Sequence, residues 1–196
     1  MTLRSHNATT SEIESFSQVY ALLARLWLQE VDVSLLDRWQ DENFAEAFTA
    51  AGGIVAFTDQ VDELATDYCQ LFVGPKNHLA PYQSVWETGE LQSEIASSVQ
   101  RFADLLHYQQ RSDCPHTMID HLGTQFDIMA QSTSGTVRSA CGQVADEIAA
   151  EFFARHLTWP ERLLVAASAR ASSPFYRAMI EMTADFLSSQ RSVWLG

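Results

Sequence analysis

Four residues whose side chains bind metals or transfer protons lie within eight positions of the chain, at Cys114, His116, Asp120 and His121. A structural zinc site needs four such ligands at a spacing that closes a tetrahedron, and a catalytic site needs three. The spacing here matches no closed tetrahedral pattern, and the three cysteines of the chain form no CxxC pair. We therefore keep a metal-binding protein or enzyme that uses Cys114, His116 and His121 only as the second of two alternatives for the function of this chain.

The chain contains no motif for nucleophilic catalysis or phosphate binding. It has no GxSxG, P-loop or GxGxxG sequence. Cys69 lies between apolar neighbours in a helical pattern, which predicts a small core residue. His156 is expected to form a hydrogen bond in the core or at a helix end. We therefore predict a protein that is not an enzyme, with no catalytic residues, no metal and no cofactor.

The segment CQLFVGPKNHLAPYQSVWETGE, residues 69–90, interrupts the helical pattern around it. Pro75 and Pro81 restrict their own φ angles and the residues before them, so this loop should have a semi-fixed shape. Tyr82 and Trp86 carry large apolar rings that lose little rotamer entropy on binding. These features predict one wall of a binding groove. The alternative is that both rings, and Trp86 in particular, plug the core beneath the loop.

Asp120 and His121 fall within a predicted helix over residues 117–131. Neighbouring side chains on a helix point about 100° apart, so one of them can face a groove while the other supports the helix. An unpaired carboxylate at the edge of a groove binds arginine in a bidentate manner. The alternative is that Asp120 stabilises the helix dipole in the first turn. The spacing alone leaves both roles open.

Apolar residues at helical spacing predict an all-α protein, because no strand-length alternation competes with them. The predicted helices cover residues 13–27, 61–72, 91–106, 117–131 and 141–156, with short helices over 33–40 and 43–50 and further starts near Thr158-Trp159-Pro160-Glu161 and Ser173-Pro174. The polar, proline-containing segment 109–116 predicts a hinge. We therefore expect a compact multi-helix fold, within one structural domain, of two helical lobes. These are residues 1–108, with a loop over 73–89, and residues 117–196.

The composition is that of a folded, acidic protein. The 196 residues are 46% apolar and carry a net charge of −13, with 3 arginines against 12 acidic residues over positions 1–75. This charge repels nucleic acids and anionic membranes and attracts cationic ligands. The N-terminus has no apolar signal core, and no stretch approaches about 18 uninterrupted apolar residues. With an odd number of widely spaced cysteines, these features predict a cytoplasmic protein without membrane insertion.

Four sequence segments, in order, resemble motifs of the TorD/DmsD family of redox-enzyme maturation chaperones. They are Tyr68-x-x-Leu71-Phe72-Val73-Gly74-Pro75, Ala80-Pro81-Tyr82-x-Ser84-Val85-Trp86, Asp120-His121-Leu122, and the segment from Phe152 through His156-Leu157 to Trp159. The similarity runs from about residue 10 to residue 190. The sequence departs from the family pattern at Ala80, Tyr68, Tyr82, Met118 and Gln125, and Trp159 follows Leu157 by two residues instead of three. The groove chemistry at these positions is left open.

The resemblance implies a cytoplasmic, all-helical chaperone. Such a protein binds the twin-arginine signal peptide, and the apo form, of a molybdenum-cofactor-dependent reductase and delays Tat export until the cofactor is inserted. Cofactor-inserting proteins are further expected partners, and the chain is expected to be a monomer or a homodimer that swaps domains at 109–116. The first alternative is an assembly chaperone of the nitrate-reductase type for a molybdoenzyme subunit that is not exported. The sequence does not identify the client, nor decide whether nucleotide or molybdenum cofactor binds.

A twin-arginine signal needs acidic side chains for its guanidinium groups and an apolar groove for the rest. Asp120, helped by Glu87 or Glu90, is the predicted acidic partner. The predicted signal-peptide-binding residues are Tyr68, Leu71, Phe72, Gly74, Pro75, Pro81, Tyr82, Ser84, Trp86, Asp120 and His121. Prolines in the groove wall would lower the entropy lost on binding.

Overall fold

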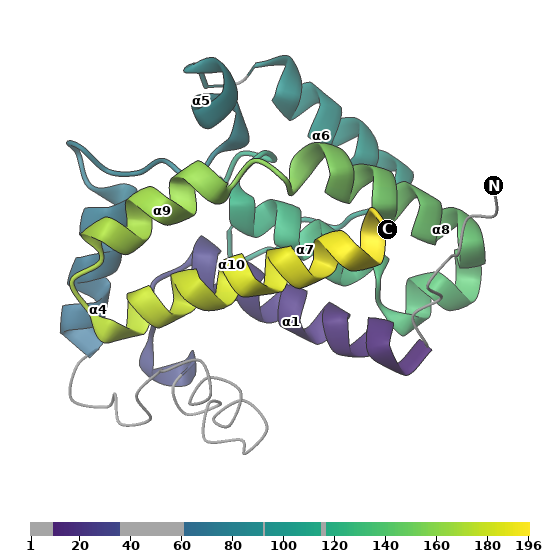
Figure 1. Cartoon of the computed structure of the whole chain (residues 1–196), viewed down its shortest axis with the longest axis horizontal. Coiled ribbons are helices and arrows are strands. Elements are labelled where there is room, and N and C mark those ends of the chain that lie inside the picture. The colour runs from purple at the N-terminus through teal and green to yellow at the C-terminus, as the bar shows by residue number, and fades with distance from the viewer. Residues whose placement is uncertain (1–9, 36–60, 92, 115–116) are drawn as a thin grey trace. The chain divides into compact units, whose positions relative to one another are not determined.

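The computed structural model describes residues 10–35, 61–91, 93–114 and 117–196, which are mostly helical (Figure 1). The elements are α1 (Thr10–Leu28), α4 (Val61–Tyr68), the π-helical turn η1 (Cys69–Val73), α5 (Gln83–Thr88), α6 (Glu94–Leu105), α7 (Leu122–Ser132), α8 (Gly135–His156), α9 (Glu161–Arg170) and α10 (Pro174–Trp194). Within these residues the only β-type pairing is an isolated bridge between Tyr82 and His121. The prediction of an all-α protein is confirmed. No described helix is both long enough and apolar enough to cross a membrane.

Contacts divide the chain into two compact units. The first unit comprises residues 1–28, 82–160 and 187–196, and the second comprises 29–81 and 161–186. This division differs from the two expected lobes, because residues 109–116 lie inside the first unit. A hinge at 109–116 stays a prediction. The short helices expected over 33–40 and 43–50 fall outside the described residues, except for residues 33–35, which are helical.

Close packing of α1 on α7 organises the first unit. The side chains of α7 are buried along nearly its whole length, and α1 contributes Tyr20, Leu23 and Trp27 to the same core. Gly123 permits this approach: a Cβ atom there would lie 2.6 Å from the Leu28 Cγ and 3.1 Å from the Ala24 carbonyl oxygen. The lack of a side chain at this position in the first turn of α7 therefore lets α7 approach α1 closely.

Aromatic packing forms the core of the second unit. The ring of Tyr68 lies 5.4 Å from that of Phe72 and 5.9 Å from that of Tyr176, measured between centroids. Leu64 and Leu71 complete the buried stripe of α4 and η1. This is the stripe that the apolar spacing predicts for residues 61–72, and the helical segment stops before Gly74-Pro75 as expected.

One buried polar group connects two elements of the second unit. The Asp67 carboxylate accepts hydrogen bonds from the backbone N–H groups of Ser172 (3.2 Å) and Ser173 (2.8 Å), just before α10. The Ser173 hydroxyl in turn accepts from the Tyr176 N–H at 3.1 Å, as an N-cap does. Burial alone would raise the pKa of the Asp67 carboxyl, but the hydrogen bonds from Ser173 and Ser172 together lower it below its ordinary value.

Three local expectations are wrong. Residues 83–88 form α5 instead of a loop, and the helix ends at Gly89, whose φ of 79° is the left-handed conformation that glycine adopts readily. The helix expected over 117–131 begins only at Leu122, because His121 is extended and caps it. Cys69 is exposed rather than in the core, because it lies on the face of the helix away from Tyr68 and Phe72.

Candidate functional site

Two motif segments that are distant in sequence meet in the first unit, at the start of α5. The Gln83 N–H donates to the Asp120 carbonyl oxygen at 3.1 Å. The Ser84 N–H and hydroxyl donate to Oδ2 of the Asp120 carboxylate at 3.1 and 2.5 Å. Asp120 therefore satisfies N–H groups at the N-terminus of α5, which no residue of α5 itself can satisfy.

The Asp120 carboxylate is fully buried, and its second oxygen is unusual. Its side chain is 0% exposed, and Oδ1 has no hydrogen-bond partner within the described residues. Buried polar atoms in native proteins almost always have a partner, so this oxygen has unused capacity to accept a hydrogen bond. The geometry supports a structural role for Asp120, and direct binding of an arginine stays a prediction.

His121 connects α7 to the residue that precedes α5. Its Nδ1 accepts a hydrogen bond from the Gly123 N–H at 3.0 Å, which caps α7. Burial lowers the pKa of His121 to about 3, so the ring is neutral at physiological pH and Nδ1 can accept. The His121 ring also packs edge-on against the Tyr82 ring, at 5.0 Å between centroids. Burial and the nearby Asp120 carboxylate raise the pKa of the Tyr82 hydroxyl.

A buried network of amide and ring nitrogens anchors α5 from its inner side. Oε1 of Gln83 accepts from Gln125 Nε2 at 2.8 Å and lies 2.9 Å from His156 Nδ1. The Trp159 indole donates to Gln125 Oε1 at 2.9 Å, and His156 Nε2 lies 3.1 Å from the Ser98 hydroxyl. The consistent arrangement is a neutral His156 with its proton on Nδ1, since Gln83 Oε1 only accepts.

The network explains the sequence departure at Gln125 and places His156. Gln125 donates through its amide nitrogen to Gln83, which an ionised glutamate cannot do. Burial, followed by the positive charges of Arg155 and Arg101, lowers the pKa of His156 to about 4. His156 lies in the last turn of α8 and is 3% exposed, so the expectation of a core or helix-end histidine is confirmed.

The two large rings of the predicted groove wall are only half-buried. Tyr82 precedes α5 and Trp86 lies four residues later within it, and both are of intermediate exposure. Glu87 and Glu90 nearby are exposed. Trp86 is therefore not a full core plug. The outer surface of α5 combines accessible aromatic area with negative charge.

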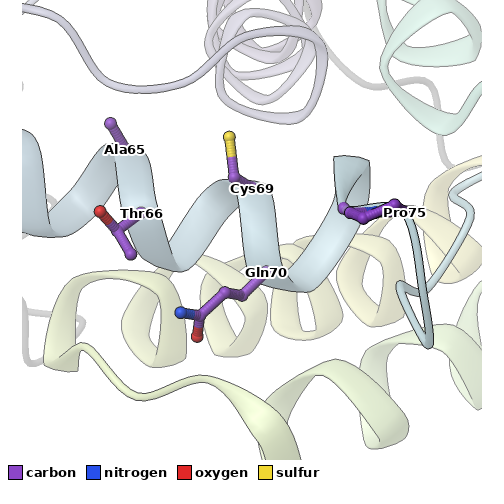
Figure 2. Close-up of a pocket in the computed structure, with 6 residues that line it drawn as sticks. Ala65, Thr66, Cys69, Gln70 and Pro75 are labelled. Atoms are coloured by element: carbon purple, nitrogen blue, oxygen red, sulfur yellow. The ribbon is translucent and has the colours of Figure 1, made fainter.

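The predicted site residues of the second unit fall into two groups. Tyr68, Leu71 and Phe72 are 6%, 2% and 5% exposed and form the core, while Pro81 is also buried. Gly74 and Pro75 instead line an open depression of about 390 Å³ with Ala65, Thr66, Cys69 and Gln70 (Figure 2). The sequence interpretation missed these last four residues because none of them belongs to the aromatic motif. Roles for the whole set in peptide binding stay predictions.

The described residues do not support a metal site near Cys114. No three His, Cys, Asp or Glu side chains there are placed to hold a metal ion. His116 lies outside the described residues. His121 uses Nδ1 to cap α7 and packs its ring on Tyr82.

Comparison with known proteins identifies the family. The family model for the nitrate reductase delta subunit matches residues 40–165 of this chain. The chaperone protein YcdY of Escherichia coli strain K12 is 24% identical over 127 residues, which are 65% of this chain and 62% of that protein, less than two thirds of its length. No solved structure matches. The match covers the loop, α5, the Asp-His segment and the polar network described above. The names of the matching family and of this relative are not those of enzymes, as the sequence analysis predicts. The chain belongs to the nitrate reductase delta subunit family, which confirms the resemblance to the family of redox-enzyme maturation chaperones.

Proposed function

We propose that this protein is a cytoplasmic assembly chaperone for a molybdenum-cofactor-dependent reductase. It binds the twin-arginine signal peptide of the reductase, and also the apo enzyme, and delays export until the cofactor is inserted. The family match supports the general role. The observation that carries the peptide-binding role is the outer surface of α5, where half-buried Tyr82 and Trp86 lie near the exposed Glu87 and Glu90.

The chemistry of this surface suits such a peptide. The rings supply apolar area for the hydrophobic part of the signal, at a small cost in rotamer entropy. Glu87 and Glu90 supply carboxylates for the arginine pair, and the net charge of −13 speeds the encounter with a basic peptide. Asp120 acts through α5: it fixes Ser84, and with it the turn that presents Trp86.

Calorimetric titration of a signal peptide from a Tat-exported reductase tests the role of the α5 surface. Trp86→Ala should weaken binding by about tenfold or more, because an aromatic ring that becomes buried against the peptide contributes at least about 1.4 kcal/mol. Leu105→Ala is the matched control, since Leu105 is a 61% exposed apolar residue of α6 in the same unit. Equal affinity of both variants and wild type would remove the α5 surface from the site. A peptide with both arginines replaced by glutamine should also bind more weakly.

Two substitutions at one position separate the possible roles of Asp120. Asp120→Asn keeps an oxygen that accepts from Ser84 but removes the charge, whereas Asp120→Ala leaves both Ser84 donors without their partner. If Asp120 only positions α5, Ala should weaken peptide binding and Asn should largely preserve it. Equal loss in both variants would instead show that the carboxylate charge itself binds arginine.

The description of the matching family favours one alternative, an assembly chaperone for a molybdoenzyme subunit that is not exported. Such a chaperone would bind the client without a twin-arginine leader. Capture of a cofactor-free reductase that lacks its signal, with no measurable affinity for the isolated signal, would support this alternative over the proposal above.

A further inference from the structure

The second unit has an apolar depression on the face of α4 and η1 that points away from its aromatic core. Ala65 and Cys69, one turn apart, project to one side of the helix, and Thr66 and Gln70 project to another (Figure 2). Pro75 closes the depression at the end of η1. Within each of these two rows the side chains are four residues apart, so the depression runs along the helix axis.

The depression continues into an acidic one through two shared residues. Thr66 and Gln70 also line a second hollow of about 400 Å³, with Asp62, Glu63, Asp67 and Ser172. Asp67 already accepts hydrogen bonds with both carboxylate oxygens. Asp62 and Glu63 are exposed, and no Lys or Arg is among the residues that line either hollow. One continuous surface thus changes from acidic to apolar along α4.

The backbone also departs from regular α-helix at the apolar end. The Gly74 N–H donates to the Cys69 carbonyl oxygen at 2.6 Å, five residues back, which is the π-helical pattern. A Cβ atom on Gly74 would approach that oxygen to 3.1 Å. Short π-helical turns are frequent at functional sites in proteins, since they alter which side chains a helix presents.

We infer that this α4 surface is a second docking surface, which binds a peptide segment with a positively charged side chain next to apolar ones. The inference rests on the proposed function, because a twin-arginine signal has this chemistry. The cationic side chain pairs with Asp62 and Glu63, and the apolar residues fill the hollow between Ala65, Cys69 and Pro75. All residues that line this surface belong to the second unit, and none of them belongs to α5.

The thiol of Cys69 reports occupancy directly, because it lies in the apolar hollow and is exposed. We would measure its alkylation rate by mass spectrometry with and without the signal peptide, using Cys114 of the first unit as the internal reference. At about 90% saturation the Cys69 rate should fall by about tenfold, since only free protein reacts. The Cys114 rate should not change. A Cys69 thiol that is already unreactive without peptide would mean that another part of the chain fills the hollow, and this would overturn the inference.

Charge removal tests the acidic end. The double variant Asp62→Asn with Glu63→Gln should require about two- to tenfold more peptide for half-maximal protection of Cys69, as expected for exposed ion pairs. The matched control, Glu181→Gln with Asp185→Asn, removes two exposed charges of the same unit from α10 and should leave protection unchanged. Equal protection curves for both double variants would overturn the acidic half of the surface.

The outcomes separate this inference from the proposed function. Calorimetric binding of the signal without protection of Cys69 would overturn the inference and leave the proposed function standing. A synthetic peptide with one arginine followed by leucine and alanine is the second probe. Protection by this peptide, with no binding of the signal, would support the docking surface and contradict the proposed function. No protection by either peptide would overturn the inference.

Discussion

The motif residues of the first unit are fixed by hydrogen bonds, whereas those of the second unit are fixed by packing. Around α5, Asp120 binds Ser84, and Gln83 joins Gln125 and His156 in a buried network. Around η1, the rings of Tyr68, Phe72 and Tyr176 meet at centroid distances of 5.4 to 6.5 Å. The family motifs of the two units are therefore held in place by different kinds of interaction.

This difference bears on how each unit presents its outer surface. A hydrogen-bonded network is directional, so it fixes the orientation of α5 and of Trp86 on its far side. Aromatic packing is less directional but buries more apolar area, and it leaves the opposite face of α4 and η1 open. Substitutions in the two units should therefore differ in their size and in their dependence on pH.

The largest expected effect is in the packed core of the second unit. Phe72→Ala should lower the free energy of unfolding by about 3–5 kcal/mol, because the ring is buried against Tyr68 and Tyr176 and leaves a cavity. Urea denaturation measures the change. Phe72→Leu is the control and should retain most of the stability. A loss under about 1 kcal/mol for Phe72→Ala would contradict a packing-dominated second unit.

The next effect tests whether the first unit also depends on packing. Gly123→Ala places a Cβ atom 2.6 Å from the Leu28 side chain and 3.1 Å from the Ala24 carbonyl, so it should cost about 1–3 kcal/mol. Adding Leu28→Ala removes the closer contact and should restore part of the loss relative to the sum of the single variants. Strict additivity in this double-mutant cycle would mean that α1 and α7 do not meet as described.

Sequence patterns predicted the helices well because each buried stripe is a local property. The stripe through Leu64, Tyr68 and Phe72 needs only the helical period to be recognised. The same reasoning wrongly placed Cys69 in the core. An apolar residue next to the buried stripe can be buried or exposed, and its residue type alone does not decide between the two. The same reasoning also failed for α5, whose residues carry no long apolar stripe and whose N-terminus is capped by Asp120.

The candidate site was harder to predict because its contacts are not local. Ser84 and Asp120 are 36 residues apart, and Gln83 and His156 are 73 apart. The sequence made Asp120 a predicted site residue, but only the structure shows that its carboxylate accepts hydrogen bonds at the start of α5. In the depression on α4, only Gly74 and Pro75 belong to a motif segment. The other lining residues, which are Ala65, Thr66, Cys69 and Gln70, are small or polar and carry no motif signal.

Acid should weaken the first unit through its hydrogen-bonded histidine. Burial lowers the pKa of His156 from its ordinary 6.5 to about 4. Between these values the unfolded chain binds a proton at this position and the folded chain does not, so stability falls as the pH falls. His156→Asn keeps a donor toward Gln83 but does not titrate, and its free energy of unfolding should vary less with pH over this range. Parallel pH profiles for the variant and wild type would contradict a neutral, buried His156.

The smallest effect concerns the polar anchor of the second unit, and it occurs in a different pH range. Asp67→Asn keeps one acceptor for the two N–H groups before α10, so it should cost about 0.5–2 kcal/mol at neutral pH. Because the folded-state pKa of Asp67 is lowered, its stabilisation is complete above the ordinary value of 3.8 and is lost as the pH falls below it. The difference between wild type and variant should therefore shrink only in strong acid, below the range in which His156 acts. Asp62→Asn, an exposed acid of the same helix, should change stability by no more than about 0.5 kcal/mol at any pH. If the stability difference between wild type and Asp67→Asn already disappears near pH 6, the two units do not respond to acid in different pH ranges.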